Sequence, residues 1–444
     1  MCPSEPASEP AYVPAAPGRR LRLAFPPGAI AVASGLVVYG GSTYAVLAVA
    51  ARQLDARHYA SFSAFWALLN IAGIGLFLPL DQEVSRGVAD RRARGEGRGA
   101  LVRRAWTLGI AMGGAAALMV LATGPLSAHN LFGGEWGLVV VLSLAMVGAA
   151  ALYLTWGTLG GNARFPSYGW CMATLGLVLI AAGAVLMVAK VRSPVPYAAA
   201  FPLAYLIASS TGMASRGDLG GAGEHARWSE LTASMGQLTA ASVMSQLVVN
   251  SGTVVVAVLA TPAEAVVVGQ FLSGLVLTRV PIFLYTAVNV TLLPELSALV
   301  AVGDRAGFAR RLRALSAQLA AAGAVIIVGS ALLGPWVLQL VFGESYRLSG
   351  ASMAVLAAGA VAYMLTLAFG QGVVAYRRQA WVAWSWAFGV LCLAVATAIG
   401  SSLLGRVQAG YLAGSIGSLV AMGLAVWWAW SKTVLPAADP PTSA

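Results

Sequence analysis

Arg279 is the residue with the most informative chemistry, because it lies near the middle of an apolar stretch, residues 266–298, that is long enough to cross a bilayer. Pro281 follows two residues later. A charged side chain at the centre of a membrane helix costs about 2.5 kcal/mol or more, so a partner or water must satisfy it. A planar guanidinium can bond two phosphate oxygens at once. Arg279 is therefore a candidate phosphate-binding residue.

A structural role for Arg279 is the alternative. Its side chain would then bond backbone carbonyls, such as that of Leu277, which receives no hydrogen bond from Pro281. The acidic residues suggest no ion-pair partner, because all sixteen Asp and Glu fall in loops, tails or the ends of apolar spans. Thr286 shares the helical face of Arg279 seven residues on, and Asn70 is a polar residue within an earlier span. We include both in the candidate substrate site.

A second set of charged residues lies at equivalent ends of two spans. Asp81, Glu83 and Arg86 follow the second span, and Glu295 ends the eighth. We predict that they form an intracellular gate, in which acids of one half bond arginines of the other and separate in the inward-open state. Solvated helix ends are the alternative interpretation.

The composition makes the bilayer the solvent of this chain. Of its 444 residues, 59% are hydrophobic and only 10% are charged, whereas about a quarter are charged in soluble domains. Twelve apolar spans are long enough to cross as helices, the only plausible form for segments of this length. They lie near 28–50, 59–80, 105–124, 137–159, 168–189, 197–213, 236–260, 266–290, 315–340, 351–372, 381–399 and 408–430.

The basic residues predict the orientation. With the N-terminus inside, 20 of the 27 Lys and Arg fall on the inner side and 6 on the outer side, Arg279 being the last. This bias is typical of a protein with both termini in the cytoplasm, and it explains the net charge of +11 without a nucleic-acid partner. In the segment 306–317, Phe308, Leu312 and Leu315 share one face. That pattern indicates a helix lying on the inner leaflet, or charge that only sets the topology.

The two halves of the chain resemble each other. Spans 2 and 8 both end in acidic residues and run into a basic loop, at offsets of 209 and 212 residues. We predict two six-helix lobes of one topology, as in transporters that rock one half against the other. The predicted parts are a disordered cytoplasmic N-terminus at 1–27, an N-lobe at 28–213, a cytoplasmic linker at 214–235, a C-lobe at 236–430 and a disordered cytoplasmic tail at 431–444.

Five stretches resemble one family, and the resemblance extends over about residues 28–430. They are LDARHYASFSAFWALLN, TLGGNARFPSYG, WSELTASMGQLTAASVMSQLVVNSG, TRVPIFLYTAVNVTLLPELSALVAVGD and VFGESYRLS. The chain resembles the polysaccharide transporters, the oligosaccharide-lipid flippases of the MOP flippase superfamily. This resemblance implies an all-α polytopic membrane protein of MATE-like architecture, with about twelve helices in two six-helix lobes around a central cavity. It also implies a polyprenyl-diphosphate-linked glycan as cargo.

We therefore expect a flippase that moves a polyprenyl-diphosphate-linked oligosaccharide across the bacterial plasma membrane by alternating access, for surface polysaccharide synthesis. A cation-coupled multidrug extruder of the same superfamily is an alternative, although spans 1 and 7 lack the buried carboxylate that it needs. A membrane-embedded glycan polymerase or acyltransferase is another, although no GxSxG, HExxH or P-loop pattern occurs in a fitting context.

The expected partners follow from this function. They are the lipid-linked glycan, membrane lipids and the glycosyltransferases or polymerase of the same pathway. The histidines, His58, His129 and His225, lie in or near loops, so we expect no metal. We also expect no cofactor and no catalytic residue.

Overall fold

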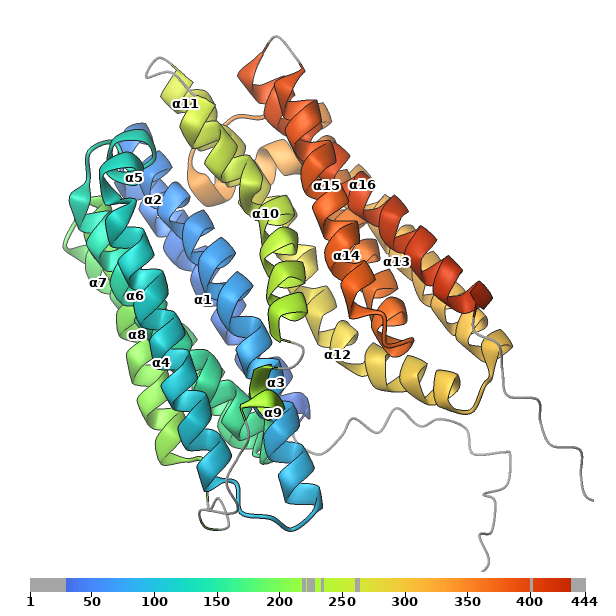
Figure 1. Cartoon of the computed structure of the whole chain (residues 1–444). Coiled ribbons are helices and arrows are strands. Elements are labelled where there is room, and N and C mark those ends of the chain that lie inside the picture. The colour runs from blue at the N-terminus through green and yellow to red at the C-terminus, as the bar shows by residue number, and fades with distance from the viewer. Residues whose placement is uncertain are drawn as a thin grey trace, which may run out of the picture.

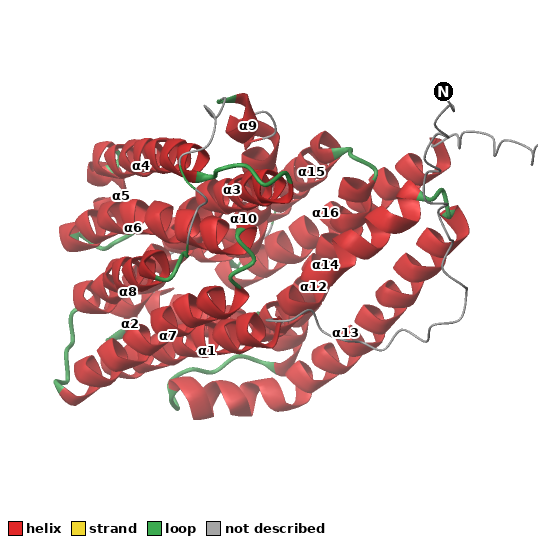
Figure 2. Cartoon of the chain, turned by 90° about the horizontal axis from the view of Figure 1, so that it is seen from below, coloured by secondary structure: helices red, strands yellow, loops and turns green. Residues whose placement is uncertain are grey.

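The computed structural model describes residues 29–217, 221, 228–232, 235–259, 264–399 and 402–432, except for some side chains within helices. The predicted N-terminal segment 1–27 and the tail beyond residue 432 lie outside the described residues, as does much of the linker. Throughout the described part, regular secondary structure consists of helices, and no strand occurs (Figures 1 and 2).

Among the described residues, the first half of the chain contains eight α-helices and one π-helical turn. They are α1 (Ala29–Gln53), α2 (Ala56–Leu68), η1 (Leu69–Ile74), α3 (Gly75–Ala93), α4 (Gly99–Ala122), α5 (Gly124–Asn130), α6 (Trp136–Gly161), α7 (Phe165–Val188) and α8 (Pro194–Ala214). α2, η1 and α3 follow one another without a loop. They form a single long helical run over residues 56–93.

The described part of the second half forms eight further helices. They are α9 (Ser229–Thr232), α10 (Met235–Leu259), α11 (Ala265–Thr278), α12 (Val280–Ala301), α13 (Arg305–Phe342), α14 (Gly350–Ala375), α15 (Gln379–Ala398) and α16 (Leu403–Lys432). Every predicted span overlaps one of the helices or helical runs. Within the described residues, nine helices or helical runs are long and apolar enough to cross a membrane by length and composition. The chain is therefore a helical, multi-pass membrane protein.

Helix boundaries follow from capping residues as well as from apolar length. The Asp55 carboxylate accepts a hydrogen bond from the backbone amide of His58 at 2.9 Å, which caps the start of α2. Asp304 accepts the amide of Gly307 at 2.7 Å and caps α13 in the same way. Such side chains satisfy amides in the first turn that have no partner inside the helix.

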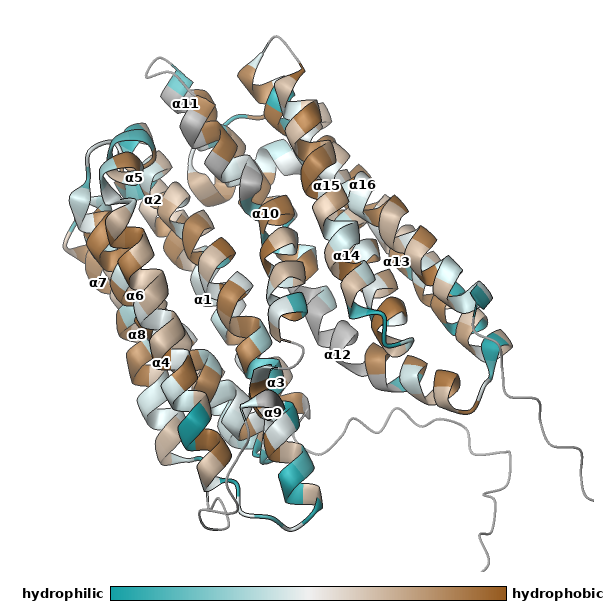
Figure 3. Cartoon of the chain, viewed as in Figure 1, coloured by the Kyte–Doolittle hydropathy of each residue, from teal (hydrophilic) through white to brown (hydrophobic). Residues whose placement is uncertain are grey.

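Each half of the chain packs mainly on itself. α6 contacts α3, α4 and α8 in the first half, and α14 and α16 contact each other in the second. α1 packs closely on α7 because Gly169 lacks a side chain: a Cβ there would lie 2.1 Å from the carbonyl oxygen of Ala31. In Figure 3, apolar residues cover the middle of the helices and polar residues gather near their ends. Exposed side chains such as Val188 and Leu332 fit contact with lipid.

Two predicted details of the helices are wrong. The basic loop predicted directly after the second span begins later, because the helix continues to Ala93 and places Asp81 and Glu83 inside it. The segment 306–317 is not a separate surface helix but the first part of α13. Its apolar face was predicted correctly: Phe308, Leu312 and Leu315 are all buried, against other helices instead of lipid headgroups.

Candidate functional site

Arg279 lies at a break between two helices. α11 ends at Thr278, α12 begins at Val280, and Pro281 occupies the first turn of α12. A proline at that position removes one backbone donor, so a continuous helix would lose a hydrogen bond there. The Thr278 hydroxyl takes up one carbonyl near the break, donating to the oxygen of Gly274 at 3.0 Å. The sequence interpretation of one unbroken span is corrected accordingly.

The Arg279 side chain is buried and only partly hydrogen-bonded. Its exposed fraction is 4%. Nη1 donates to Oδ1 of Asn250 at 3.0 Å, and Nδ2 of Asn250 donates to Oε1 of Gln246 at 2.8 Å. Among the described residues, Nε and Nη2 have no hydrogen-bond partner. The partner that Arg279 does have is thus a side-chain amide on α10, and not the Leu277 carbonyl considered from the sequence.

Aromatic side chains surround the guanidinium. Its Cζ atom lies 6.0 Å from the centroid of the Trp66 ring, a cation–π distance. The hydroxyl groups of Tyr44, Tyr363 and Tyr411 lie close enough to interact with it electrostatically. The Tyr411 hydroxyl has no hydrogen-bond partner among the described residues. No carboxylate in the described part of the chain is among the groups that act on the guanidinium.

This site, which we call the Arg279 site, joins both halves of the chain. Tyr44 comes from α1 and Trp66 from α2, whereas Asn250, Tyr363 and Tyr411 come from α10, α14 and α16. Tyr411 reaches it because the neighbouring residue on α14 is a glycine. A Cβ on Gly359 would lie 2.4 Å from Cε1 of Tyr411.

Asn70 and Thr286 are placed less directly. Nδ2 of Asn70 donates to the carbonyl oxygen of Trp66 at 2.7 Å, within its own helical run and at the start of the π-helical turn. Asn70 therefore supports the backbone beside Trp66, and its role toward a substrate stays a prediction. Thr286 lies in α12, and its side chain is outside the described residues.

The predicted gate residues form ion pairs within each half. Glu83 pairs with Arg86 on the same helix. Glu295 on α12 pairs with Arg311 on α13 at 2.7 Å. These pairs do not join one half to the other, and the gate as predicted remains untested in this conformation.

The two halves hydrogen-bond to each other at the opposite end of the long helices. The Arg52 guanidinium at the end of α1 donates to the carbonyl oxygens of Leu340 and Val341 at the end of α13. The Tyr346 hydroxyl donates to the carbonyl oxygen of Ala51 at 3.0 Å. We call this set the Arg52 contact. It closes the two halves together near the start of α2.

Asp81 has neighbours that its sequence position did not suggest. It is partly buried in α3, and the aromatic side chains Tyr153 and Tyr168 lie close enough for their hydroxyls to interact with it electrostatically. Tyr153 in turn packs against Trp156, with ring centroids 5.0 Å apart. The carboxylate thus lies near the buried Tyr153 of α6 and the partly buried Tyr168 of α7, both within the first half.

The sequence did not identify most of the side chains that surround Arg279. Tyr44, Trp66 and Tyr411 are aromatic residues in apolar spans, and nothing in their spacing marks them as neighbours. Asn250 and Gln246 carried a usable signal, since polar side chains within a span need partners. Among the described residues, no group of three His, Cys, Asp or Glu side chains is arranged to hold a metal ion.

The fold is that of MATE transporters of the MOP superfamily. An outward-facing MATE transporter aligns over 91% of this chain and 96% of its own, with a TM-score of 0.68 and 14% identity. An inward-facing MATE structure gives the same score over 90% of this chain and 96% of its own, also at 14% identity. A MOP superfamily transporter from Pyrococcus furiosus matches with a TM-score of 0.67, 15% identity and coverages of 91% and 96%. These solved structures are transporters and not enzymes.

The sequence relatives place the chain more narrowly. The uncharacterized protein Rv1510 of Mycobacterium tuberculosis is 30% identical over 352 residues, which cover 76% of this chain and 78% of the relative. This chain belongs to the same family as that protein. The uncharacterized protein Rv3630 of the same organism is 29% identical over 390 residues, with coverages of 82% and 86%. No family model matches the sequence.

Proposed function

We propose that this protein is a flippase for a polyprenyl-diphosphate-linked oligosaccharide, located in a bacterial plasma membrane with both termini in the cytoplasm. The observation that carries the proposal is the Arg279 site. The Arg279 guanidinium is buried, and two of its nitrogens have no hydrogen-bond partner among the described residues. These nitrogens can donate hydrogen bonds to the oxygens of an anionic group. The diphosphate of a polyprenyl-linked sugar is such a group.

The position of the site fits transport by alternating access. Residues of both halves surround Arg279, so a movement of one half against the other changes its surroundings. In transporters with internal repeats, substrate sites lie near the repeat interface and use interrupted helices. The break between α11 and α12 provides such an interruption. The basic residue is supplied by the second half alone.

A cation-coupled multidrug extruder is the second candidate, and one observation favours it. Asp81 places a carboxylate near Tyr153, which is buried, and Tyr168, which is partly buried, in the first half. A carboxylate in that setting can bind a proton or another cation, which coupled export requires. The fold is equally compatible with both functions, because the solved MATE structures share it.

Deletion of the gene in its own bacterium distinguishes the two candidates. The flippase proposal expects lipid-linked sugars to accumulate on the cytoplasmic side and surface glycan to fall. Normal surface glycan without accumulation, combined with increased sensitivity to several unrelated toxic compounds, would favour the extruder.

Complementation with Arg279 variants links the phenotype to the site. Arg279→Gln removes the charge and should reduce transport about tenfold or more, since a hydrogen bond to a charged group contributes about 1.5–3 kcal/mol. Arg279→Lys should retain part of the activity. Arg192→Gln, in the connection between α7 and α8, is the control for general loss of an arginine. Membrane levels of each variant must match the wild type. Full activity of Arg279→Gln at normal levels would refute the role of the site.

A further inference from the structure

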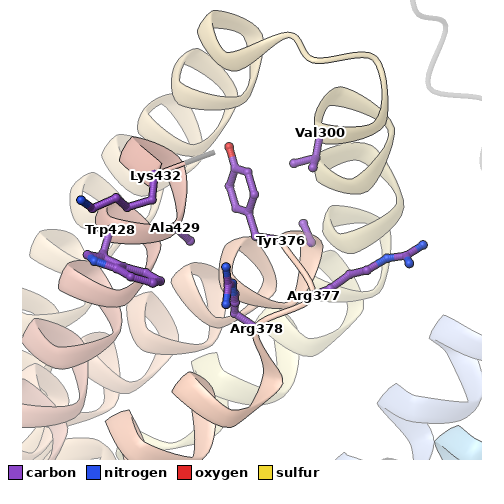
Figure 4. A pocket seen from close by; sticks show the side chains of 8 residues that line it. Val300, Tyr376, Arg377, Arg378, Trp428, Ala429 and Lys432 are labelled. Atoms are coloured by element: carbon purple, nitrogen blue, oxygen red, sulfur yellow. The ribbon is translucent and has the colours of Figure 1, made fainter. Parts of the chain in front are cut away.

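A cavity of about 330 Å³ opens at one end of the second half, away from the Arg279 site. Three elements form it: the end of α12 with Val300, the end of α14 with Tyr376, and the end of α16 with Trp428. Figure 4 shows the ring of Tyr376 standing between α12 and α16. A volume of this size is at the lower limit for small-molecule sites, so it suits a compact group.

The lining of this cavity is basic. Arg377, Arg378 and Lys432 contribute three positive charges, and none of the lining residues is acidic. Figure 4 shows Arg378 beside Tyr376 in the middle of the cavity, with Lys432 on the α16 side and Arg377 extending away from both. Arg305, at the start of α13, also lies close enough to Tyr376 to act on it electrostatically. Such an arrangement attracts an anion.

Aromatic packing holds Arg378 and Tyr376 in place. The Arg378 guanidinium lies 5.4 Å from the centroid of the Trp428 ring, and Trp428 packs on Trp381 with centroids 5.1 Å apart. Tyr376 makes an edge-to-face contact with Phe308 at 4.9 Å. These contacts fix Arg378 and Tyr376 before any ligand binds, which lowers the entropic cost of binding.

The surroundings of the cavity are those of a membrane interface. Trp384, six residues after Arg378 on α15, and Trp427, next to Trp428 on α16, expose 73% and 61% of their surface. Tryptophan is enriched at the level of the lipid headgroups. Further along the same helices, Phe388 and Leu424 are exposed as well. An acyl chain can therefore lie along α15 and α16 while its headgroup occupies the basic cavity.

From these observations we infer that the cavity between the ends of α12, α14 and α16 binds the headgroup of an anionic phospholipid, with Arg378 and Lys432 contacting the phosphate. The bound lipid is a resident of the membrane and not the transported cargo. This site is independent of the Arg279 site and of the function proposed for it.

Native mass spectrometry of the full-length protein, purified in a mild detergent, tests the inference. Retained adducts are counted after adding phosphatidylglycerol or phosphatidylcholine. The wild type should retain phosphatidylglycerol about tenfold better, a preference worth about 1.4 kcal/mol. Millimolar inorganic phosphate should not displace it. Equal retention of both lipids would overturn the inference, and displacement by inorganic phosphate would show a free-anion site instead.

Paired variants locate the binding. The double variant Arg378→Gln/Lys432→Gln should lose most of the preference for phosphatidylglycerol. The matched control Lys190→Gln/Arg192→Gln removes one lysine and one arginine from the connection between α7 and α8, and should keep it. Arg378→Lys retains the charge but loses the planar group that lies over Trp428, so its preference should fall between those of the wild type and the double variant, which guards against misfolding as the explanation. Unchanged adducts in the double variant, or equal losses in the control, would contradict the assignment.

Discussion

At the scale of single residues, the protein carries a buried arginine whose guanidinium is surrounded by an amide group and aromatic rings. Asn250 bonds one nitrogen of Arg279, and Trp66 presents a ring to the guanidinium. A buried charge is costly unless it is paired and hydrogen-bonded. Because no carboxylate lies among the groups that act on it in the described part of the chain, the site keeps a positive potential. That potential is what an anionic headgroup would recognise.

Replacing Asn250 by Ala should destabilise the protein. The substitution removes the hydrogen-bond acceptor at Nη1 and leaves a buried charged group unsatisfied, which costs about 1–3 kcal/mol. Thermal unfolding of the purified protein in detergent measures the effect. Asn130→Ala, at an exposed position at the end of α5, is the control and should change little. Equal stability of the two variants would mean that Asn250 does not hold Arg279.

The cap of α2 should make stability dependent on acid pH. Burial raises the pKa of Asp55, but hydrogen bonds from His58 and the Arg57 amide outweigh it, so the net pKa is lower than usual. A group with a lowered folded-state pKa contributes stability above its unfolded pKa and loses it as the pH falls through the folded value.

The comparison of wild type with Asp55→Ala tests that dependence. Near neutral pH the variant should be less stable by about 1 kcal/mol, the usual contribution of an N-cap. The gap should shrink at about pH 3, where the carboxyl group takes up a proton. Thermal unfolding at both pH values is the measurement, and a gap that does not change with pH would contradict the role assigned to the carboxylate.

At the scale of elements, the two halves share an irregular helix at the same place. Asn70, in the π-helical turn of the first half, and Arg279, at the helix break of the second half, are 209 residues apart, which matches an offset between the halves. The π-helical turn and the break both interrupt regular helix hydrogen bonding, and such interruptions are common at functional sites. At this position the first half has the amide of Asn70, and the second half has the guanidinium of Arg279.

The sequence predicted the helices well and the site in part. Long apolar runs have one stable form in a bilayer, so the spans could be read directly. Arg279 was recognisable because a charge in an apolar span needs an explanation. Tyr44, Trp66 and Tyr411 were not recognisable, because an aromatic residue in a span can face lipid, protein or a site equally well. Only the packing of α1, α2 and α16 around Arg279 decides between these positions.

Gly359 should tolerate no side chain. Gly359→Ala would place a methyl group 2.4 Å from the Tyr411 ring, and overpacking of this kind costs about 1–3 kcal/mol. The variant should lower both thermal stability and transport, since Tyr411 must move away from Arg279. On the same helix, Gly370→Ala is the matched control, because its nearest atom would be 3.8 Å away. A Gly359→Ala protein as stable and active as the control would refute the packing argument.

At the scale of the whole molecule, the halves are joined at the end where the Arg52 contact lies. Tyr59 supports this closure: its ring meets that of Tyr346 with centroids 5.8 Å apart, and its hydroxyl lies 3.4 Å from Oγ of Ser273. At the other end, the ion pairs of Glu83 and Glu295 remain within their own halves. The described residues are thus closed at the Arg52 contact, which the proposed alternating access would have to open.

Weakening the Arg52 contact should open that end. Ser273→Cys places a thiol in the closed region, in a chain whose native cysteines are replaced by alanine. Adding Arg52→Ala or Tyr346→Phe should increase its labelling by a membrane-impermeant maleimide about fivefold or more, since each hydrogen bond contributes about 1 kcal/mol. Arg406→Ala is the control: it removes an arginine whose bond, to the carbonyl oxygen of Thr397 at 2.9 Å, stays within the second half. Labelling that is equally slow in all of these proteins would show that the contact does not hold the closed state.

Arg279 is proposed to select a diphosphate headgroup for transport, and transbilayer movement of defined lipids tests this role. Purified protein in liposomes receives a fluorescent polyprenyl diphosphate sugar, the matching monophosphate sugar or an uncharged polyprenyl glycoside, and an impermeant quencher reports the transferred fraction. The diphosphate lipid should move at least about tenfold faster than the uncharged one, and Arg279→Gln should abolish this difference. Equal movement of all three lipids, or an unchanged preference in Arg279→Gln, would contradict this role.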